Sequence, residues 1–285
     1  MIELRWARTG GRTSEEAQRC YGPAAVRVTD ADIPAPPFPV KLPWVGVAPL
    51  RMDKQRGRPV LVEFWDFLRV PSLRTLPYLK AWHERYSIGP GGPASGLRVI
   101  SVHCGGHEAS RDEASIREAV DRLGIEHPVL IDSEFELWQM YDNPGWPARY
   151  LFDADQKLVD VQHGEGGYLE TEAVIRELLS DDGDDVGLLR GEDDPDALIV
   201  VPTDDVEGAY NGPYEAGGVW GVFVGAGTVT TNGMAMELTA PGAFNLIWHE
   251  HHTAGVLELE VSGGVECLAT CFTPGLAPPE SDPAG

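Results

Sequence analysis

The chain has 285 residues, which is enough for two domains that each bury their own core. Its 45 acidic residues outnumber 22 basic ones, and the formal net charge of -23 argues against nucleic acid and anionic membrane surfaces as partners. Every Lys and Arg lies at or before Arg190, so the rest of the sequence offers no such cation to a phosphate or another polyanion.

Residues 1–39 are polar and become rich in proline toward their end, so we treat them as an N-terminal extension. Residues 40–180 then alternate between apolar strands and amphipathic helices. The predicted strands are 59–65, 97–103, 128–132, 148–153 and 158–163. The predicted helices are 72–86, 113–123, 134–141 and 170–179. A βαβ start, an antiparallel hairpin and a closing helix together predict an α/β domain.

The sequence changes character after residue 180. Residues 181–207 hold eleven acidic residues against the single Arg190, which predicts an acidic linker. Residues 208–275 alternate between apolar and polar side chains without a helical period, and we expect a small β-sandwich there, followed by a tail at 276–285. The fold class is therefore an α/β domain joined to a small all-β sandwich domain.

The N-terminus has no apolar stretch of signal-peptide length, and no segment approaches the roughly 20 apolar residues that span a bilayer. The four cysteines, Cys20, Cys104, Cys267 and Cys271, are too scattered for a disulfide framework. We therefore expect a cytoplasmic protein. Four residues of strand span about 13 Å, farther than the about 7 Å between Cα atoms that a disulfide allows, so Cys267 and Cys271 should be two reduced core thiols.

Several sequence motifs occur in an order that is informative. They are Phe64-Trp65, residues 73–86, Val-Ile-Ser-Val-His at 99–103, Trp-Pro-Ala-Arg-Tyr-Leu-Phe-Asp at 146–153, and residues 164–175. Together they resemble the thioredoxin-like redoxin domain of the DipZ family, which is related to TlpA-type proteins and to the AhpC/TSA group. The run 257–272 resembles the small, carbohydrate-binding-module-like β-domain that usually follows in that family.

The resemblance implies thiol-disulfide exchange or peroxide handling by a Cys-x-x-Cys pair at a helix start, where the helix dipole favours a thiolate. In this sequence the four positions read Arg69-Val-Pro-Ser72, and no cysteine lies between Cys20 and Cys104. Pro71 and Pro77 stand where the family places its two prolines. The resemblance therefore implies a thioredoxin-like fold whose helix-start thiols are replaced.

The candidate site residues of this region are Arg69, Ser72 and Pro147. Arg69 stands at a helix start and would either hold an anionic or carbonyl group of a ligand or be a solvated side chain. Ser72 is expected to be the N-cap of the helix. Trp146-Pro147 matches the cis-proline loop that faces the active site, and it is either a peptide-docking edge or a turn kept for folding.

Cys104 is the one thiol whose position suggests a role. It follows the strand 97–103, which should run parallel to the strand that ends at Trp65, so both carboxyl ends should open at one edge of the sheet. Cys104 is therefore either redox-active or an inert packing residue.

Two groups of residues in the C-terminal domain are weaker candidates. In the run 248–252, His249 and His251 would share one face of a strand, but two histidines make a weak metal site, so we expect a solvated edge and neither metal nor cofactor. An aromatic set could form a sugar-stacking platform or pack in the core. That set is Trp220, Trp248, Tyr210 and Tyr214.

The sequence thus predicts a redox-silent binding protein that takes a polypeptide or a small molecule at the retained active-site edge, with no nucleic acid or membrane partner. The alternative is a thiol-dependent oxidoreductase or peroxidase that acts through Cys104. A third hypothesis is a carbohydrate-binding protein that uses the C-terminal module. Whether the protein is an enzyme is open among these three.

Overall fold

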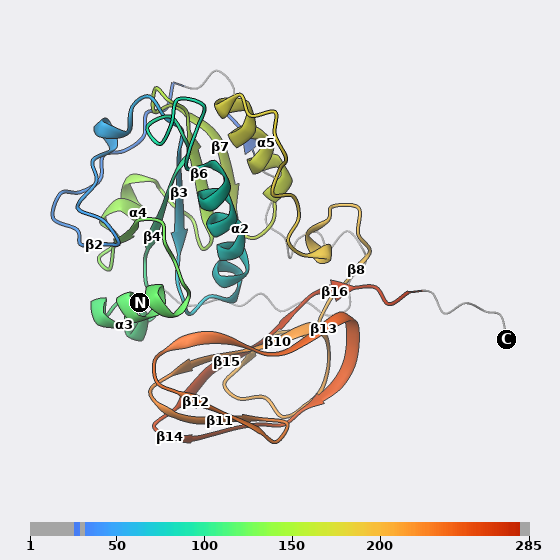
Figure 1. The fold of residues 1–285 in the computed structure, drawn as a ribbon. Coiled ribbons are helices and arrows are strands. Elements are labelled where there is room, and N and C mark those ends of the chain that lie inside the picture. Colours follow the sequence, from blue (N-terminus) through green and yellow to red (C-terminus); the bar gives the residue numbers. More distant parts are fainter. Residues whose placement is uncertain (1–25, 29–31, 280–285) are drawn as a thin grey trace.

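A computed structural model describes residues 26–28 and 32–279 (Figure 1). Its first half is built on a seven-stranded sheet with the strand order β1-β7-β6-β3-β4-β5-β2. The central strands β3, β4 and β5 are parallel to one another, β6 runs antiparallel to β3, and β7 runs antiparallel to β6. The strands are β1 (Val26–Arg27), β2 (Trp44–Val45), β3 (Val60–Trp65), β4 (Arg98–His103), β5 (Val129–Ile131), β6 (Ala148–Phe152) and β7 (Leu158–His163).

Helices cover both faces of this sheet. They are α2 (Val70–Tyr86), α3 (Glu113–Arg122), α4 (Glu136–Met140) and α5 (Tyr168–Leu179), with short 3-10 turns at Met52–Gln55, Glu108–Ser110 and Gly191–Asp193. One apolar core lies under α2, α3 and α5, and a second lies under α4 and the segment around Trp44. Each predicted strand and helix of the α/β domain is confirmed within two residues, because buried strands such as β3 are almost continuously apolar.

The α/β domain starts earlier than predicted. β1 pairs antiparallel with β7, with Val26 opposite Val161, and Pro34 forms a bridge with Lys157. The described part of the extension therefore belongs to the sheet, and the predicted boundary at residue 40 lies too late. Cys20 and the other residues before 26 lie outside the described residues. None of the described helices is both long and apolar enough to cross a membrane.

The second half is made of strands, as predicted. One sheet has the order β13-β10-β15-β9 and another the order β12-β11-β14, and a shared apolar core that includes Phe223, Leu257 and Phe272 lies between them. We call this part the β-module. Its strands are β9 (Val206–Glu207), β10 (Gly212–Val224), β11 (Gly227–Thr231), β12 (Met234–Leu238), β13 (Gly242–Leu257), β14 (Leu259–Gly263) and β15 (Glu266–Thr273).

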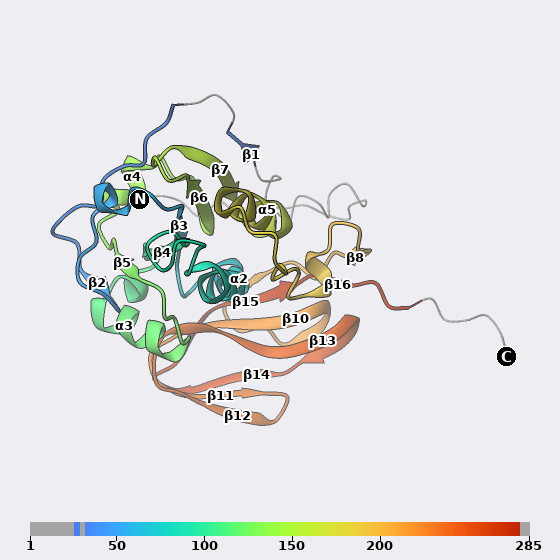
Figure 2. The ribbon, with the colours of Figure 1, turned by 45° about the horizontal axis from the view of Figure 1, so that its top comes forward.

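The β-module packs against the helical layer of the α/β domain (Figure 2). The contact core joins Leu68, Val70 and Leu73 to Val222, Ala243 and Cys271. The main-chain N–H of Ala243 donates a hydrogen bond of 3.1 Å to the carbonyl of Phe67, in the loop between β3 and α2. One side of the start of α2 is thus covered by the β-module.

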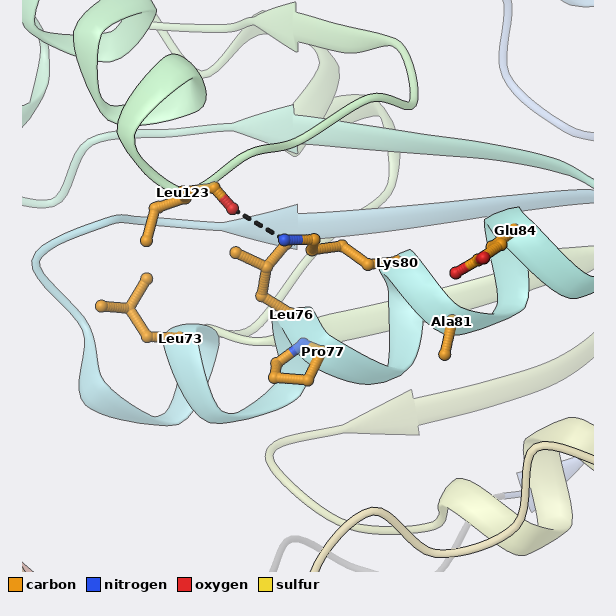
Figure 3. A pocket seen from close by; sticks show the side chains of 7 residues that line it. All are labelled: Leu73, Leu76, Pro77, Lys80, Ala81, Glu84 and Leu123. Carbon is orange, nitrogen blue, oxygen red and sulfur yellow. Dashed lines mark hydrogen bonds between the residues drawn. The ribbon is translucent and has the colours of Figure 1, made fainter. Parts of the chain in front are cut away.

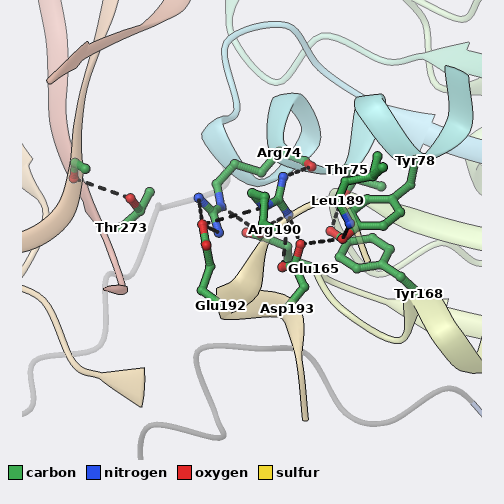
Figure 4. A network of polar contacts seen from close by, with 11 residues as sticks. Arg74, Thr75, Tyr78, Glu165, Tyr168, Leu189, Arg190, Glu192, Asp193 and Thr273 are labelled. Atoms are coloured by element: carbon green, nitrogen blue, oxygen red, sulfur yellow. Dashed lines mark hydrogen bonds and ion pairs between the residues drawn. The ribbon is translucent and has the colours of Figure 1, made fainter. Parts of the chain in front are cut away.

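The predicted acidic linker is not a free tether. Its strand β8 (Ile199–Val200) pairs with β16 (Gly275–Leu276), and β9 pairs with β15. Upstream of these strands, the linker is attached to α2, because the Tyr78 hydroxyl donates to Asp193 at 2.6 Å and accepts from the N–H of Leu189 at 2.9 Å (Figure 4). The acidic composition suggested a solvated segment, but several of its carboxylates have partners in the folded domain.

Candidate functional site

The carboxyl ends of β3 and β4 open at one edge of the sheet, as predicted. Trp65 is paired in parallel with His103, and the N–H of Cys104 donates to the carbonyl of Trp65 at 3.0 Å. The peptide bond between Trp146 and Pro147 is cis, also as predicted. We call the surface formed by Trp146, Pro147 and the start of α2 the cis-proline edge.

Arg69 stands on this edge, where it flanks the first residue of α2. Its guanidinium carbon lies 5.0 Å from the centroid of the Trp146 ring, a cation–π arrangement. Gly106 leaves the space for it, because a Cβ there would lie 3.0 Å from Arg69 Nη2 and 3.2 Å from the Trp146 ring. Arg69 is therefore half-buried against an aromatic ring, whereas a fully solvated side chain was one of the two expectations.

The prediction that Ser72 caps α2 is wrong. The helix already begins at Val70, and the carbonyl of Arg69 accepts from the N–H of Leu73 at 3.1 Å. Ser72 therefore lies inside the first turn with an exposed fraction of 0%, and its Oγ accepts from the main-chain N–H of Asp66 at 3.3 Å. A hydroxyl without solvent contact does not serve as a nucleophile here.

Asp66 organises the edge, and sequence analysis missed it. The buried carboxylate accepts hydrogen bonds from the N–H of Leu68 at 3.0 Å, the N–H of Gly106 at 2.8 Å and the hydroxyl of Ser110 at 3.3 Å. These bonds tie the loop before α2 to the loop after β4. An acidic residue directly after a buried strand was the available signal, because a buried carboxylate requires partners.

Comparison with known proteins identifies relatives of the α/β domain. No family model matches the chain. A stretch of 136 residues, 48% of the chain, is 32% identical to protein DipZ of Mycobacterium tuberculosis, of which it covers only 19%. A stretch of 148 residues, 52% of the chain, is 24% identical to the thiol-disulfide oxidoreductase YkuV of Bacillus subtilis and covers 95% of it. The protein contains a DipZ/TlpA-like redoxin domain.

A solved structure titled as a thioredoxin-like protein in the oxidized form is similar to 52% of the chain and 95% of its own length, with a TM-score of 0.45 and 24% identity. The redoxin domain has the strand order and the cis-proline loop expected of a thioredoxin-like fold, and the relative that it matches over almost its whole length is named a thiol-disulfide oxidoreductase. The chain spans about a fifth of DipZ, so DipZ is similar to it over this domain alone.

Cys104 lies in the interior of the redoxin domain. The side chain has no solvent exposure, and its Sγ lies 3.5 Å from Asp132 Oδ2, to which the thiol donates. Burial and the nearby carboxylates of Asp132 and Asp66 raise the pKa of the Cys104 thiol well above its ordinary value. A thiol that stays protonated and is not accessible to solvent is poorly suited to attack a disulfide or a peroxide.

We expect Cys104 to resist alkylation by N-ethylmaleimide at pH 8 in the native protein and to react fully after denaturation. Peptide mass spectrometry measures both states. The same measurement after exposure to peroxide should find no sulfenic acid at Cys104. Rapid native labelling, or oxidation by stoichiometric peroxide, would contradict the burial argument and restore the oxidoreductase hypothesis.

A polar row crosses the sheet beneath α2. Glu63 on β3 stands opposite Arg149 on β6 and beside Ser101 on β4, whose hydroxyl lies 3.3 Å from Glu63 Oε2. Burial raises the pKa of Glu63 to about 8, and Arg149 and Ser101 only partly offset that effect. Ser101 also contacts His127 at 2.8 Å, and burial lowers the pKa of His127 to about 3.

The raised pKa of Glu63 makes stability depend on pH. The unfolded carboxyl ionises near 4.5 and the folded one near 8, so stability should fall as the pH rises between these values, by up to about 1.4 kcal/mol per pH unit. Glu63→Gln should remove this slope and be most stabilising relative to the wild type above pH 8. Urea unfolding from pH 4.5 to 9 tests this, with exposed Glu84→Gln as the control. Parallel slopes for Glu63→Gln and the wild type would contradict it.

An apolar groove of about 380 Å³ runs along α2 beside the end of α3 (Figure 3). The amino group of Lys80 reaches across it to the carbonyl of Leu123 at 2.9 Å. The groove contains no thiol, histidine or hydroxyl. Its lining residues are Leu73, Leu76, Pro77, Lys80, Ala81, Glu84 and Leu123.

The histidine run on β13 does not form the predicted pattern. Residues 249–252 bulge out of the β10–β13 ladder, since Ala216 pairs with Thr253 and Gly218 with Trp248. His249 Nε2 lies 2.9 Å from the Tyr214 hydroxyl, so it is not simply solvated. Among the described residues, no cluster of three or more His, Cys, Asp or Glu side chains is arranged to hold a metal.

The aromatic set was expected either to form a sugar-stacking platform or to pack in the core, and its residues do not share one surface. Trp220 packs toward the redoxin domain, whereas Tyr214 is buried in the core of the β-module. Trp248 is 70% exposed on β13. Cys267 and Cys271 are both free, as predicted, with Cys271 buried and Cys267 half-buried.

Proposed function

We propose that the redoxin domain is a redox-silent binding domain that docks an extended polypeptide at the cis-proline edge. The observation that carries this proposal is the main chain of Trp146. Within the described residues its N–H and carbonyl form no hydrogen bond, whereas the next carbonyl, that of Pro147, accepts from Gly164 at 2.8 Å. A free donor and acceptor beside a sheet are what an added strand pairs with, which favours a polypeptide over a small molecule.

The absence of redox chemistry in this proposal rests on the thiols. The helix-start positions hold Arg69 and Ser72, and Cys104 is buried as a neutral thiol. The carbohydrate hypothesis has no comparable support, because Trp220 and Tyr214 pack in different cores and Trp248 is exposed apart from them. A cytoplasmic location remains a prediction from the scattered cysteines.

We expect no disulfide reduction in an insulin turbidity assay with dithiothreitol above the uncatalysed rate. In the same protein, the reduced and carboxamidomethylated B peptide of insulin should shift the amide NMR signals of Trp146 and its neighbours. Turnover that a thiol blocker abolishes would contradict the redox-silent part of the proposal. Chemical-shift changes confined to the β-module would contradict the docking part.

A further inference from the structure

Two arginines line the cis-proline edge, each on an aromatic ring. Arg69 lies over Trp146, and the guanidinium carbon of Arg111 lies 5.2 Å from the centroid of Phe135. The two rings are neighbours, with centroids 6.2 Å apart. The edge therefore presents two cations on neighbouring aromatic rings, one of which is the Trp146 side chain.

Neither arginine has a carboxylate partner within the described residues. The chain has 45 acidic residues against 22 basic ones. Several arginines of the redoxin domain are paired with Asp or Glu within 4.0 Å, although Arg58, Arg98 and Arg149 form no such ion pair among the described residues. The pairs include Arg74 with Glu165, Arg85 with Asp181 and Arg117 with Glu113.

Both side chains are held in place before any ligand arrives. The Nε of Arg111 donates to the carbonyl of Gly105 at 2.9 Å, and Gly106 leaves room for the Arg69 guanidinium against Trp146. The buried carboxylate of Asp66 already accepts three hydrogen bonds and forms no ion pair with either arginine. Among the described residues, the remaining guanidinium N–H groups have no partner and are available to bind an anion.

We infer that the cis-proline edge selects polypeptides that carry an Asp or Glu side chain and holds its carboxylate with Arg69 and Arg111. This inference rests on the proposed docking function and specifies its ligand. A planar guanidinium matches a carboxylate through paired hydrogen bonds. Because the net charge of -23 repels anions at long range, the selection must come from these local contacts.

The test pans a phage-displayed library of random ten-residue peptides against the full-length protein, and the enriched peptides are then synthesised. We expect enrichment of Asp or Glu at one position. Replacing that residue by Asn or Gln should weaken binding tenfold or more. Arg69→Gln and Arg111→Gln should each weaken binding of the acidic peptide similarly but barely affect its neutral counterpart, as expected for a direct pair.

Arg56→Gln is the matched control, because Arg56 is exposed, precedes β3 and so lies at the opposite end of that strand from the edge. It should leave binding unchanged. Enriched peptides without an acidic preference, or equal losses for acidic and neutral peptides, would overturn this inference and leave the docking proposal intact. A library that yields no binder at the edge would overturn both. Arg111 is exposed, so Arg111→Gln tests the site without disturbing the core.

Discussion

Arg74→Met should lower the free energy of unfolding at pH 7 by at most about 3 kcal/mol, because a buried carboxylate left with no counter-ion costs about 3–5 kcal/mol and Glu165 would keep Arg190. Arg74 is only 7% exposed, and its Nε lies 2.5 Å from Glu165 Oε1. Arg190 shares that carboxylate at 3.4 Å and donates to the carbonyl of Arg74 at 2.6 Å (Figure 4). The substitution would leave Glu165 with Arg190 alone.

The decrease in the free energy of unfolding caused by Arg74→Met should be smaller at pH 5 than at pH 7. Burial already raises the pKa of Glu165, and a protonated carboxyl needs no counter-ion. The variant should also expose the linker, because Glu192 contacts Arg74 and Asp193 contacts Arg190. Cleavage after Glu192 by a Glu-specific protease should therefore become faster than in the wild type.

Arg117→Met is the matched control, since Arg117 pairs with Glu113 on the exposed surface of α3 at 2.7 Å. Pairs of that kind contribute little to stability, so its melting temperature should stay close to that of the wild type. If Arg74→Met and Arg117→Met have the same melting temperature and the protease cleaves them alike, the ion-pair network of Figure 4 does not hold the linker on the redoxin domain.

The parts of the fold that were predictable depend on local patterns. β3 is apolar except for Glu63 because both of its faces are covered, and the redoxin helices follow from their spacing and from Pro71 near a helix start. The cis peptide before Pro147 was predicted from a motif. All of these signals are carried by residues within a few positions of one another.

The missed features depend on partners far apart in the sequence. Asp66 accepts hydrogen bonds from Gly106 and Ser110, which lie some forty residues later in the sequence. The acidic linker forms hydrogen bonds with Tyr78 and Arg74, which lie more than a hundred residues before it. From composition alone these residues are expected to be polar and solvated, because composition does not show which distant residues they contact in the folded protein. The packing of the β-module on the start of α2 was missed for the same reason.

The double substitution Arg69→Cys with Ser72→Cys should create a disulfide that forms and reduces reversibly. The two positions are three apart at the start of a 17-residue helix, next to the cis-proline edge. The introduced thiol at position 69 should be the more reactive, because position 72 is fully buried and the helix N-terminus favours a thiolate at its first turn. Removal of the Arg69 cation limits how far that thiol's pKa falls.

The measurement is a redox titration with glutathione, read by mass spectrometry of the alkylated protein. Insulin reduction should be weak, since the β-module packs on Leu68 and Val70 beside the new thiols. Ser72→Cys alone supplies a thiol without a partner and should form no intramolecular disulfide. Cys271 lies close enough to Arg69 to feel its charge, so the titration is repeated in a Cys271→Ser background. If the double variant folds but forms no intramolecular disulfide under oxidising conditions, these positions do not correspond to the thiols of the family, and the redox-silent assignment loses its basis.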